Sequence, residues 1–229
     1  MIAILSDIHG NYPALKAVID DLEKFNCDKI ISLGDVTGYY CMVNECIDLL
    51  RVRNVVNIIG NHDNYLISRT NCSRSKSATR CLEYQQYVIS NENRQWLESS
   101  ISNFEFDDVS MVHAGWNDYL DEYIHTVSES YFENLAARYY FSGHTHVQAI
   151  AKFKNKIYCN PGSVGQPRDG DARAAYAIFD RHNVTMRRVR YDIDSIAKEM
   201  NTIGFEPYFY ENLYNGSCIG GKLSQLTIA

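Results

Sequence analysis

The chain lacks long hydrophobic runs, and this absence sets the first limit on its function. Nowhere in its 229 residues do eighteen consecutive apolar residues occur, which is the length that a membrane-spanning helix needs. The start, from Met1 to Leu5, runs directly into Asp7 without the basic region and apolar core of a secretory signal. We therefore expect a cytoplasmic protein without a signal peptide and without membrane contact.

Closely spaced cysteine pairs are also absent. The seven cysteines are odd in number and include no Cys-x-x-Cys pair. A disulfide framework or a thiolate zinc site is normally built from such pairs, so we expect reduced thiols. Cys41 and Cys46 are the closest pair, and we assign them no metal or redox role.

Excess positive charge is lacking as well. The 22 Lys and Arg residues are outnumbered by 28 Asp and Glu residues, which gives a net charge of −6. A negatively charged chain does not attract the phosphate backbone of a nucleic acid over a distance. A long nucleic acid is therefore not the expected partner, and a nuclease would need a basic groove or a further domain.

The first sixty residues alternate between apolar runs and amphipathic stretches. In one stretch Leu15, Val18 and Leu22 lie on a single helical face. The pattern predicts strands at 2–6, 29–33 and 55–59 and helices at about 12–25 and 43–52. Strands joined by helices pair in parallel, and strands that are apolar almost throughout are covered on both faces.

The second half of the chain differs. Residues 64 to about 100 carry polar helical patterns, which predicts a helical excursion that either covers the core or shapes a substrate pocket. Strands are then expected at about 104–113, 138–142, 147–153, 156–159, 174–180 and 184–190, with a helix near 192–202. Short gaps between some strands favour antiparallel hairpins. We expect one domain over residues 1–229 and make no prediction for the tail after Glu206.

Polar residues with metal-binding capability follow several of the apolar runs or turns. Five of the seven histidines lie in these segments, which are Asp7-Ile8-His9, Gly34-Asp35, Gly60-Asn61-His62-Asp63, Val112-His113, Gly143-His144-Thr145-His146 and the turn Asn160-Pro161-Gly162-Ser163. The carboxyl ends of parallel strands meet at one edge of a sheet, so ligands there converge on one crevice. The recurrence predicts a polynuclear metal site and therefore an enzyme.

Each segment alone has a simpler interpretation. Asp7 or Asn11 could cap the following helix, and His144 or His146 could be an ordinary surface histidine.

Two divalent ions about 4 Å apart repel by roughly 16 kcal/mol at an effective dielectric near 20, so a shared site requires an anionic bridge. Asp35, at the end of a central strand, is the expected bridge, together with a shared hydroxide.

The ordered set of segments resembles the calcineurin-like metallophosphoesterases from Met1 to about Asp192. The resemblance implies the α/β fold class, as a four-layer αββα sandwich of two mixed β-sheets flanked by helices, with the metal site at the carboxyl ends of strands. It implies one ion held by Asp7, His9, Asp35 and His146, and a second held by Asp35, Asn61, His113 and His144. Mn²⁺ is the expected metal, with Fe, Zn²⁺, Co²⁺, Ni²⁺ or Mg²⁺ as alternatives.

The segments after Gly34 and Asn160 resemble the bacterial and archaeal branch grouped with diadenosine tetraphosphatases. Branches related to serine/threonine protein phosphatases carry an arginine shortly after the bridging aspartate, whereas this chain has Gly38-Tyr39-Tyr40. Protein phosphatase and dinucleoside polyphosphate hydrolase are therefore kept only as alternatives. A non-catalytic scaffold of this fold would have lost ligands, and none is missing here.

The implied reaction is hydrolysis of a small phosphate monoester or diester. Two divalent ions, two aspartates and a bridging hydroxide leave a charge of about +1 to hold a phosphate, and metal-bound water has a pKa lowered toward about 7, so the hydroxide can attack phosphorus. Arg168 is the predicted cation for a non-bridging phosphate oxygen. The alternative is a surface ion pair of Arg168 with Asp169 or Asp171.

The leaving oxygen needs a proton. His62 lies next to Asn61 but outside the ligand set, and it is the predicted general acid, with Asp63 orienting its ring. In the alternative interpretation Asp63 caps the following helix and His62 fills a surface position.

Overall fold

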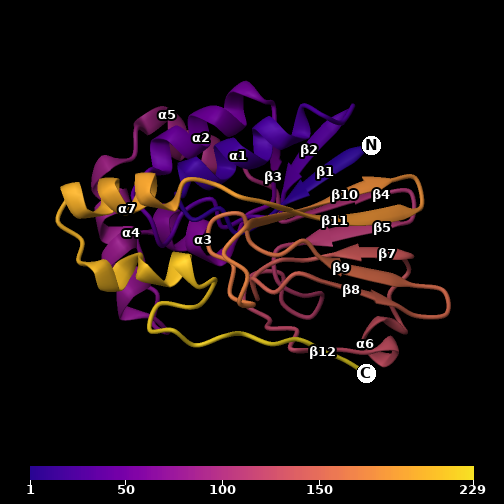
Figure 1. The fold of residues 1–229 in the computed structure, drawn as a ribbon. Helices are drawn as coiled ribbons and strands as arrows, with labels where there is room; N and C mark the ends of the chain where they lie inside the picture. Colours follow the sequence, from indigo (N-terminus) through magenta and orange to yellow (C-terminus); the bar gives the residue numbers. More distant parts are fainter.

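Two five-stranded β-sheets lie face to face in the computed structural model, which describes residues 1–229 (Figure 1). In the first sheet the three N-terminal strands run parallel, and the last two strands are antiparallel to their neighbours. Its order is β11 (Asn183–Val189), β10 (Ala174–Asp180), β1 (Ile2–Leu5), β2 (Lys29–Ser32) and β3 (Val56–Asn57). The sheet is mixed, as the resemblance to the metallophosphoesterases implied.

The second sheet is mixed as well. Its three central strands are parallel and its two edge strands antiparallel, in the order β4 (Asn103–Phe106), β5 (Val109–Val112), β7 (Tyr139–Phe141), β9 (Ile157–Asn160) and β8 (Ala149–Lys152). The single strand predicted at 104–113 is wrong. The chain reverses at Asp107, which has a left-handed φ of 47°, and β4 and β5 form a hairpin instead.

Helices cover the outer face of the first sheet (Figure 1). They are α1 (Tyr12–Leu22), α2 (Val43–Val52) and α7 (Ile193–Thr202). The Asn11 side chain accepts a hydrogen bond from Ala14 N and so begins α1, which ends earlier than predicted. Leu15 and Val18 of α1 are fully buried in the core between this layer and the sheet.

A second apolar cluster lies between the two sheets. Ile4 and Ile31 of the first sheet belong to it together with Met111 and Phe141 of the second, and all four are buried. Strands β1 and β2 thus contribute to both clusters, which explains their nearly continuous apolar character.

Residues 61–98 form three helices, α3 (Asn61–Ser68), α4 (Lys76–Val88) and α5 (Asn91–Glu98). The buried side chain of Gln85 on α4 reaches the loop after β2: its Oε1 accepts from Gly38 N at 2.8 Å, and its Nε2 donates to the carbonyl of Tyr40. This helical region therefore positions the loop that follows Asp35 in addition to covering the core.

The outer face of the second sheet carries little helix. The short helix α6 (Glu129–Phe132) and the paired strands β6 (Thr126–Val127) and β12 (Thr227–Ile228) lie there with their loops, and two 3-10 helices, η1 (Pro207–Phe209) and η2 (Glu211–Tyr214), precede β12. The fourth layer of the predicted sandwich is thus thin.

All seven cysteines are free, and none of the helices has the length and apolarity needed to cross a bilayer.

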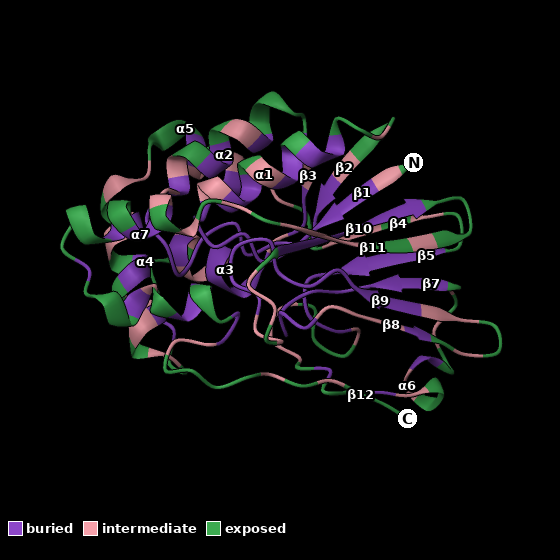
Figure 2. Ribbon diagram, viewed as in Figure 1, coloured by how far each residue is buried: buried purple, intermediate pink, exposed green.

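The loops at the carboxyl ends of the strands are buried, although loops normally lie at the surface. In Figure 2 the connections in the centre of the molecule are coloured as buried, whereas the outer faces of the helices are exposed. Every residue from 31 to 41 is buried. Polar side chains in these loops therefore need partners, which directs attention to this region.

Asp21 generates a prediction about stability. Its carboxylate is buried and accepts hydrogen bonds from Tyr176 Oη at 2.7 Å and from Arg187 Nη2 at 3.2 Å, which ties α1 to β10 and β11. Burial alone would raise the pKa of Asp21, but the hydrogen bonds from Lys24, Tyr176 and Arg187 lower it to about 2.

Asp21→Asn should lower the free energy of unfolding by about 1–3 kcal/mol at neutral pH, as measured by urea denaturation. Because the pKa is lower in the folded state, this stabilisation is present above about pH 4 and disappears as the pH falls through about 2. The exposed Asp20→Asn is the control and should change stability by less than about 0.5 kcal/mol. Equal stability of the two variants would contradict the assigned role.

Candidate metal centre

Unusual backbone conformations mark the candidate site. Nine residues other than glycine have a positive φ, and five of them are predicted ligands with φ between 53° and 64°: Asp7, His9, Asp35, His144 and His146. A residue other than glycine pays roughly 1–2 kcal/mol for this conformation. The concentration of such residues at one place indicates a functional constraint.

Neighbouring loops hold this backbone in place. The amide of Asp7 donates to the carbonyl of Gly34 at 3.0 Å, and the amide of His9 donates to the carbonyl of Asp35 at 2.9 Å. The loops after β1 and β2 therefore lie side by side, and their candidate ligands lie close together.

Two glycines let the chain pass close to the carboxylates. A Cβ atom at Gly60 would lie 2.2 Å from Asp35 Oδ1, and one at Gly143 would lie 1.9 Å from Ser6 Oγ. Neither position admits a side chain. The residues before Asn61 and His144 are therefore glycines because the backbone there passes too close to Asp35 and Ser6 for a Cβ atom.

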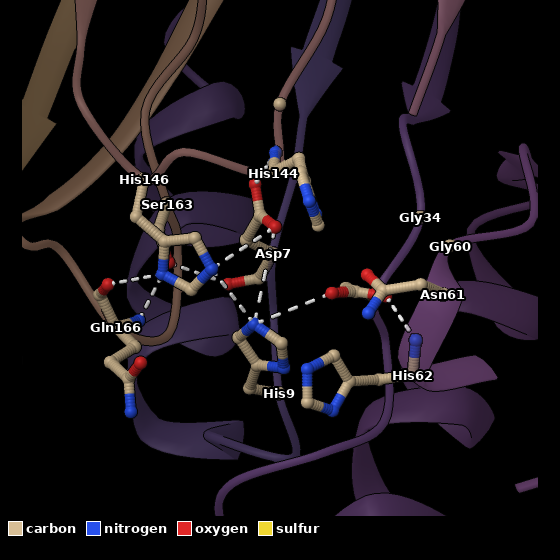
Figure 3. Close-up of polar contacts among 12 residues, drawn as sticks. Asp7, His9, Gly34, Gly60, Asn61, His62, His144, His146, Ser163 and Gln166 are labelled. Atoms are coloured by element: carbon tan, nitrogen blue, oxygen red, sulfur yellow. Dashed lines mark hydrogen bonds and ion pairs between the residues drawn. The ribbon is translucent and has the colours of Figure 1, made fainter. Parts of the chain in front are cut away.

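The first candidate group consists of Asp7, His9 and His146. Nδ1 of His9 donates to the carbonyl of Thr37 and Nδ1 of His146 to that of Gln166, both at 2.6 Å. Each neutral ring therefore presents a lone pair at Nε2, and the two Nε2 atoms lie 3.1 Å apart. Asp7 Oδ1 lies 3.3 Å from His146 Nε2. These side chains point toward one another in Figure 3.

The second candidate group consists of Asp35, His113 and His144. Nδ1 of His113 donates to the carbonyl of Leu33 at 2.8 Å, so its Nε2 also carries a lone pair. That atom lies 3.1 Å from Asn61 Oδ1, 3.2 Å from His144 Nδ1 and 3.6 Å from Asp35 Oδ2. Acceptors that converge at such distances repel one another unless a cation lies between them.

Asp35 lies between the two groups. Its Oδ2 is 3.7 Å from His9 Nε2 in the first group and 3.6 Å from His113 Nε2 in the second. Its Oδ1 accepts a hydrogen bond from the amide of His62 at 2.8 Å, in the first turn of α3. One carboxylate oxygen is thus held by the protein, and the other faces both candidate groups.

The electrostatics of the centre fit a cation. Burial lowers the pKa of His9 and of His144, so their imidazoles are neutral and able to act as ligands. Burial, with the nearby Asp63 and Asp7 carboxylates, raises the pKa of Asp35. Several buried carboxylates therefore lie close together without enough positive charge, which bound divalent ions would supply.

The structure corrects the role expected for Asp63. Its Oδ1 accepts from the amide and hydroxyl of Thr37 at 3.0 and 3.1 Å, and its Oδ2 accepts from the amide of Gly60 at 3.2 Å. It stands in the first turn of α3, where an acidic side chain reaches back to the residue before the helix. It makes no hydrogen bond to the ring of His62, so the prediction that Asp63 orients this ring is wrong.

The His62 side chain is buried, and its ring packs against two neighbouring rings. Its ring centroid lies 5.0 Å from that of His9 and 5.1 Å from that of Tyr39. Its Nδ1 is buried without a hydrogen-bond partner. The alternative that His62 fills a surface position does not hold.

Arg168 lies beside the centre, with its guanidinium over the Tyr39 ring at 5.2 Å from the centroid. The alternative ion pairs are not formed, because Asp169 and Asp171 pair with other arginines. Arg168 thus remains a half-buried cation without a carboxylate partner.

Some contacts had no signal in the sequence. The carbonyls that hold the imidazoles belong to Leu33, Thr37 and Gln166, and any residue type can provide a carbonyl. Tyr123 was also missed: its ring centroid lies 4.0 Å from that of His144, although the two residues are distant in sequence.

The chain is similar in sequence to known proteins. Residues 1–183 match the calcineurin-like phosphoesterase superfamily domain. The chain is 32% identical to the uncharacterized protein MJ0912 of Methanocaldococcus jannaschii, over 94% of this chain and 98% of the relative.

Two crystal structures have the same fold. A metallophosphoesterase from Sphaerobacter thermophilus is 32% identical, with a TM-score of 0.82 over 94% of this chain and 99% of the other. The hypothetical protein PH1004 from Pyrococcus horikoshii is 21% identical, with a TM-score of 0.81 and the same coverage. The fold class predicted from the sequence is confirmed. With most of its length matched by the domain, the chain belongs to the calcineurin-like phosphoesterase superfamily.

Proposed function

We propose that the protein is a dinuclear metal-dependent phosphoesterase that hydrolyses a small phosphate monoester or diester. The observation that carries the proposal is the position of Asp35 Oδ2, at nearly equal distances from the Nε2 atoms of His9 and His113. A carboxylate placed in this way suits two ions and one phosphate between them. The substrate is a small molecule rather than a long nucleic acid.

Seven side chains would hold the ions: Asp7, His9, Asp35 and His146 the first, and Asp35, Asn61, His113 and His144 the second. Their oxygen and imidazole donors, without thiolates, suit Mn²⁺, which is our first choice of metal, or another divalent first-row ion. When bound, such ions would supply positive charge for the phosphate and lower the pKa of water toward about 7.

The remaining roles fall to residues beside the ligands. His62 is our candidate for the proton donor to the leaving oxygen, because its ring lies next to His9 with Nδ1 unpartnered. Burial lowers its pKa, so the ring is neutral until a phosphate anion beside it favours the protonated form. Arg168 supplies the protein's positive charge for substrate.

A protein phosphatase is disfavoured by the loop after Asp35. Tyr39 is only 8% exposed there, and a Cβ at Gly38 would lie 2.5 Å from His9 Nδ1 and 2.9 Å from His62 Nδ1. The loop therefore has no room for an arginine side chain at Gly38, and Tyr39 already packs against the site.

The seven free thiols are consistent with a reducing compartment, and we place the protein in the cytoplasm.

The function is tested by removing metal, reloading single ions and assaying mononucleotides, phosphodiesters, dinucleoside polyphosphates and phosphopeptides. We expect turnover of small esters, with Mn²⁺ giving the highest rate. Preference for a dinucleoside polyphosphate or a phosphopeptide would instead support one of the alternatives. Absence of turnover with every ester and every ion would exclude the proposed function.

Asp35→Asn tests the bridge. An amide brings no negative charge, so it does not offset the repulsion of roughly 16 kcal/mol between two dications about 4 Å apart. We expect two Mn²⁺ ions per wild-type chain and one or fewer per Asp35→Asn chain, measured by mass spectrometry after desalting. The exposed Asp108→Asn is the control and should retain the wild-type content. Two ions in the Asp35→Asn protein would show that Asp35 does not bridge.

His62→Ala tests the proton donor. The variant should keep its metal content and lose roughly 10²–10⁴ in kcat for an alkyl phosphate, because the poor leaving group needs the proton. The loss should be smaller for p-nitrophenyl phosphate, whose leaving group is stable as an anion. His182→Ala, distant from the centre, is the control. Undiminished turnover of the alkyl phosphate by His62→Ala would rule out the role.

A further inference from the structure

A small pocket of about 110 Å³ opens beside the metal centre, and it includes none of the seven candidate ligands. Its walls come from distant segments: Tyr39, Ser75 and Ser77, Arg168, and the tail near Cys218. We propose that this pocket binds a second anionic group of the substrate. The substrate is then a phosphate ester whose alcohol portion carries a carboxylate or another phosphate, an inference that rests on the phosphoesterase function proposed above.

Arg168 supplies charge to the pocket. Its Nε and Nη2 donate to Gln166 Oε1 at 2.9 and 2.5 Å, which fixes the plane of the guanidinium. No carboxylate or carbonyl of the protein accepts a hydrogen bond from the remaining N–H groups of the Arg168 guanidinium. A half-buried guanidinium in this state favours a planar or tetrahedral anion that accepts two hydrogen bonds.

Tyr39 supplies a second donor. Its side chain is 8% exposed, and no protein group accepts the proton of its hydroxyl. An anion in the pocket could accept this proton in a charge-assisted hydrogen bond. The Tyr39 hydroxyl therefore suits an acceptor bound beside Arg168.

The opposite wall is the start of α4. Ser75 Oγ accepts from the amide of Ala78 at 3.1 Å and lies 3.0 Å from Ser77 Oγ. The amides of Lys76 and Ser77, the first two residues of α4 after the Ser75 cap, make no hydrogen bond within the protein, and the helix dipole favours negative charge at this end. No acidic residue lines the pocket, so every polar wall suits an anion.

The position of the pocket relates it to the leaving group. The Tyr39 ring contacts both His9 and His62, with centroid distances of 4.8 and 5.1 Å. A phosphate at the metal centre with its leaving oxygen at His62 would direct the alcohol portion along Tyr39 to Arg168. Pockets for drug-sized ligands measure about 300–1,000 Å³, so this pocket accepts a carboxylate or phosphate and not a nucleobase. The second anion, rather than the scissile phosphate, is thus the partner of Arg168.

The experiment compares esters that differ only in the second group. The substrates are phosphoglycolate, ethylene glycol bisphosphate and ethyl phosphate, and p-nitrophenyl phosphate measures general activity. We expect the Mn²⁺-loaded wild type to prefer one or both doubly anionic esters over ethyl phosphate by at least tenfold in kcat/KM, mainly through KM. Preference for only one of them identifies the second group as carboxylate or phosphate.

Ser77→Glu places a negative charge on the wall of the pocket. The ratio of kcat/KM for the preferred doubly anionic ester to kcat/KM for ethyl phosphate should then fall to near one. Ser73→Glu adds the same charge at an exposed position outside the pocket, and it should retain the wild-type ratio. Ser77→Ala is a milder change and should lower the ratio in part. It replaces Ser77→Glu as the test if the thermal melting curve shows that the glutamate variant does not fold.

Two negative results have different meanings. If p-nitrophenyl phosphate is hydrolysed but the wild-type ratio is near one, or if both Ser77 variants leave the ratio unchanged, the pocket does not bind a second anion and the phosphoesterase function stands. If no ester is hydrolysed, the proposed function fails and this inference fails with it.

Discussion

The convergence of unshared electron pairs in a buried crevice is the constraint on which the rest of this structure depends. Backbone carbonyls bind Nδ1 of His9, His113 and His146 and so leave each Nε2 facing other acceptors at 3.1–3.3 Å. Without cations this arrangement is repulsive, and the left-handed backbone at five ligands adds roughly 1–2 kcal/mol each. The two packed sheets must hold the side chains against both costs.

The fold meets this demand by joining the two sheets at their carboxyl edges. Ser163, after β9 of the second sheet, donates from its hydroxyl to the carbonyl of Asp7 after β1 of the first. The amide of His144 donates to Asp7 Oδ2 at 3.0 Å, which links β7 to the same residue. The loop that carries Asp7 is therefore braced by two loops from the other sheet. Each candidate group draws residues from both sheets, so a shift of one sheet against the other would displace both groups.

Sequence patterns pointed to the residues of the two candidate groups but not to the contacts that hold them. Asp7, Asp35 and His144 follow apolar runs, and a run followed by a ligand is a local pattern that can be recognised in one segment. The hairpin turn at Asp107 was missed because the residues on both sides continue a strand pattern. No role was predicted for Gln85, and Asp63 was assigned to the His62 ring, because their actual partners are chiefly backbone groups whose positions depend on the folded chain.

Gln166 shows how ligand geometry and substrate binding are coupled. Its carbonyl accepts from His146 Nδ1, its Oε1 accepts from Arg168, and its Nε2 donates to the Tyr40 hydroxyl at 3.1 Å. One residue thus sets the ring of a candidate metal ligand and the plane of the guanidinium that we assign to substrate. Because the buried carboxylates of the centre would repel an anion until cations are bound, we expect Arg168 alone not to retain a phosphorylated substrate. Metal loading should therefore precede substrate binding in this protein, with Gln166 keeping Arg168 oriented in both states.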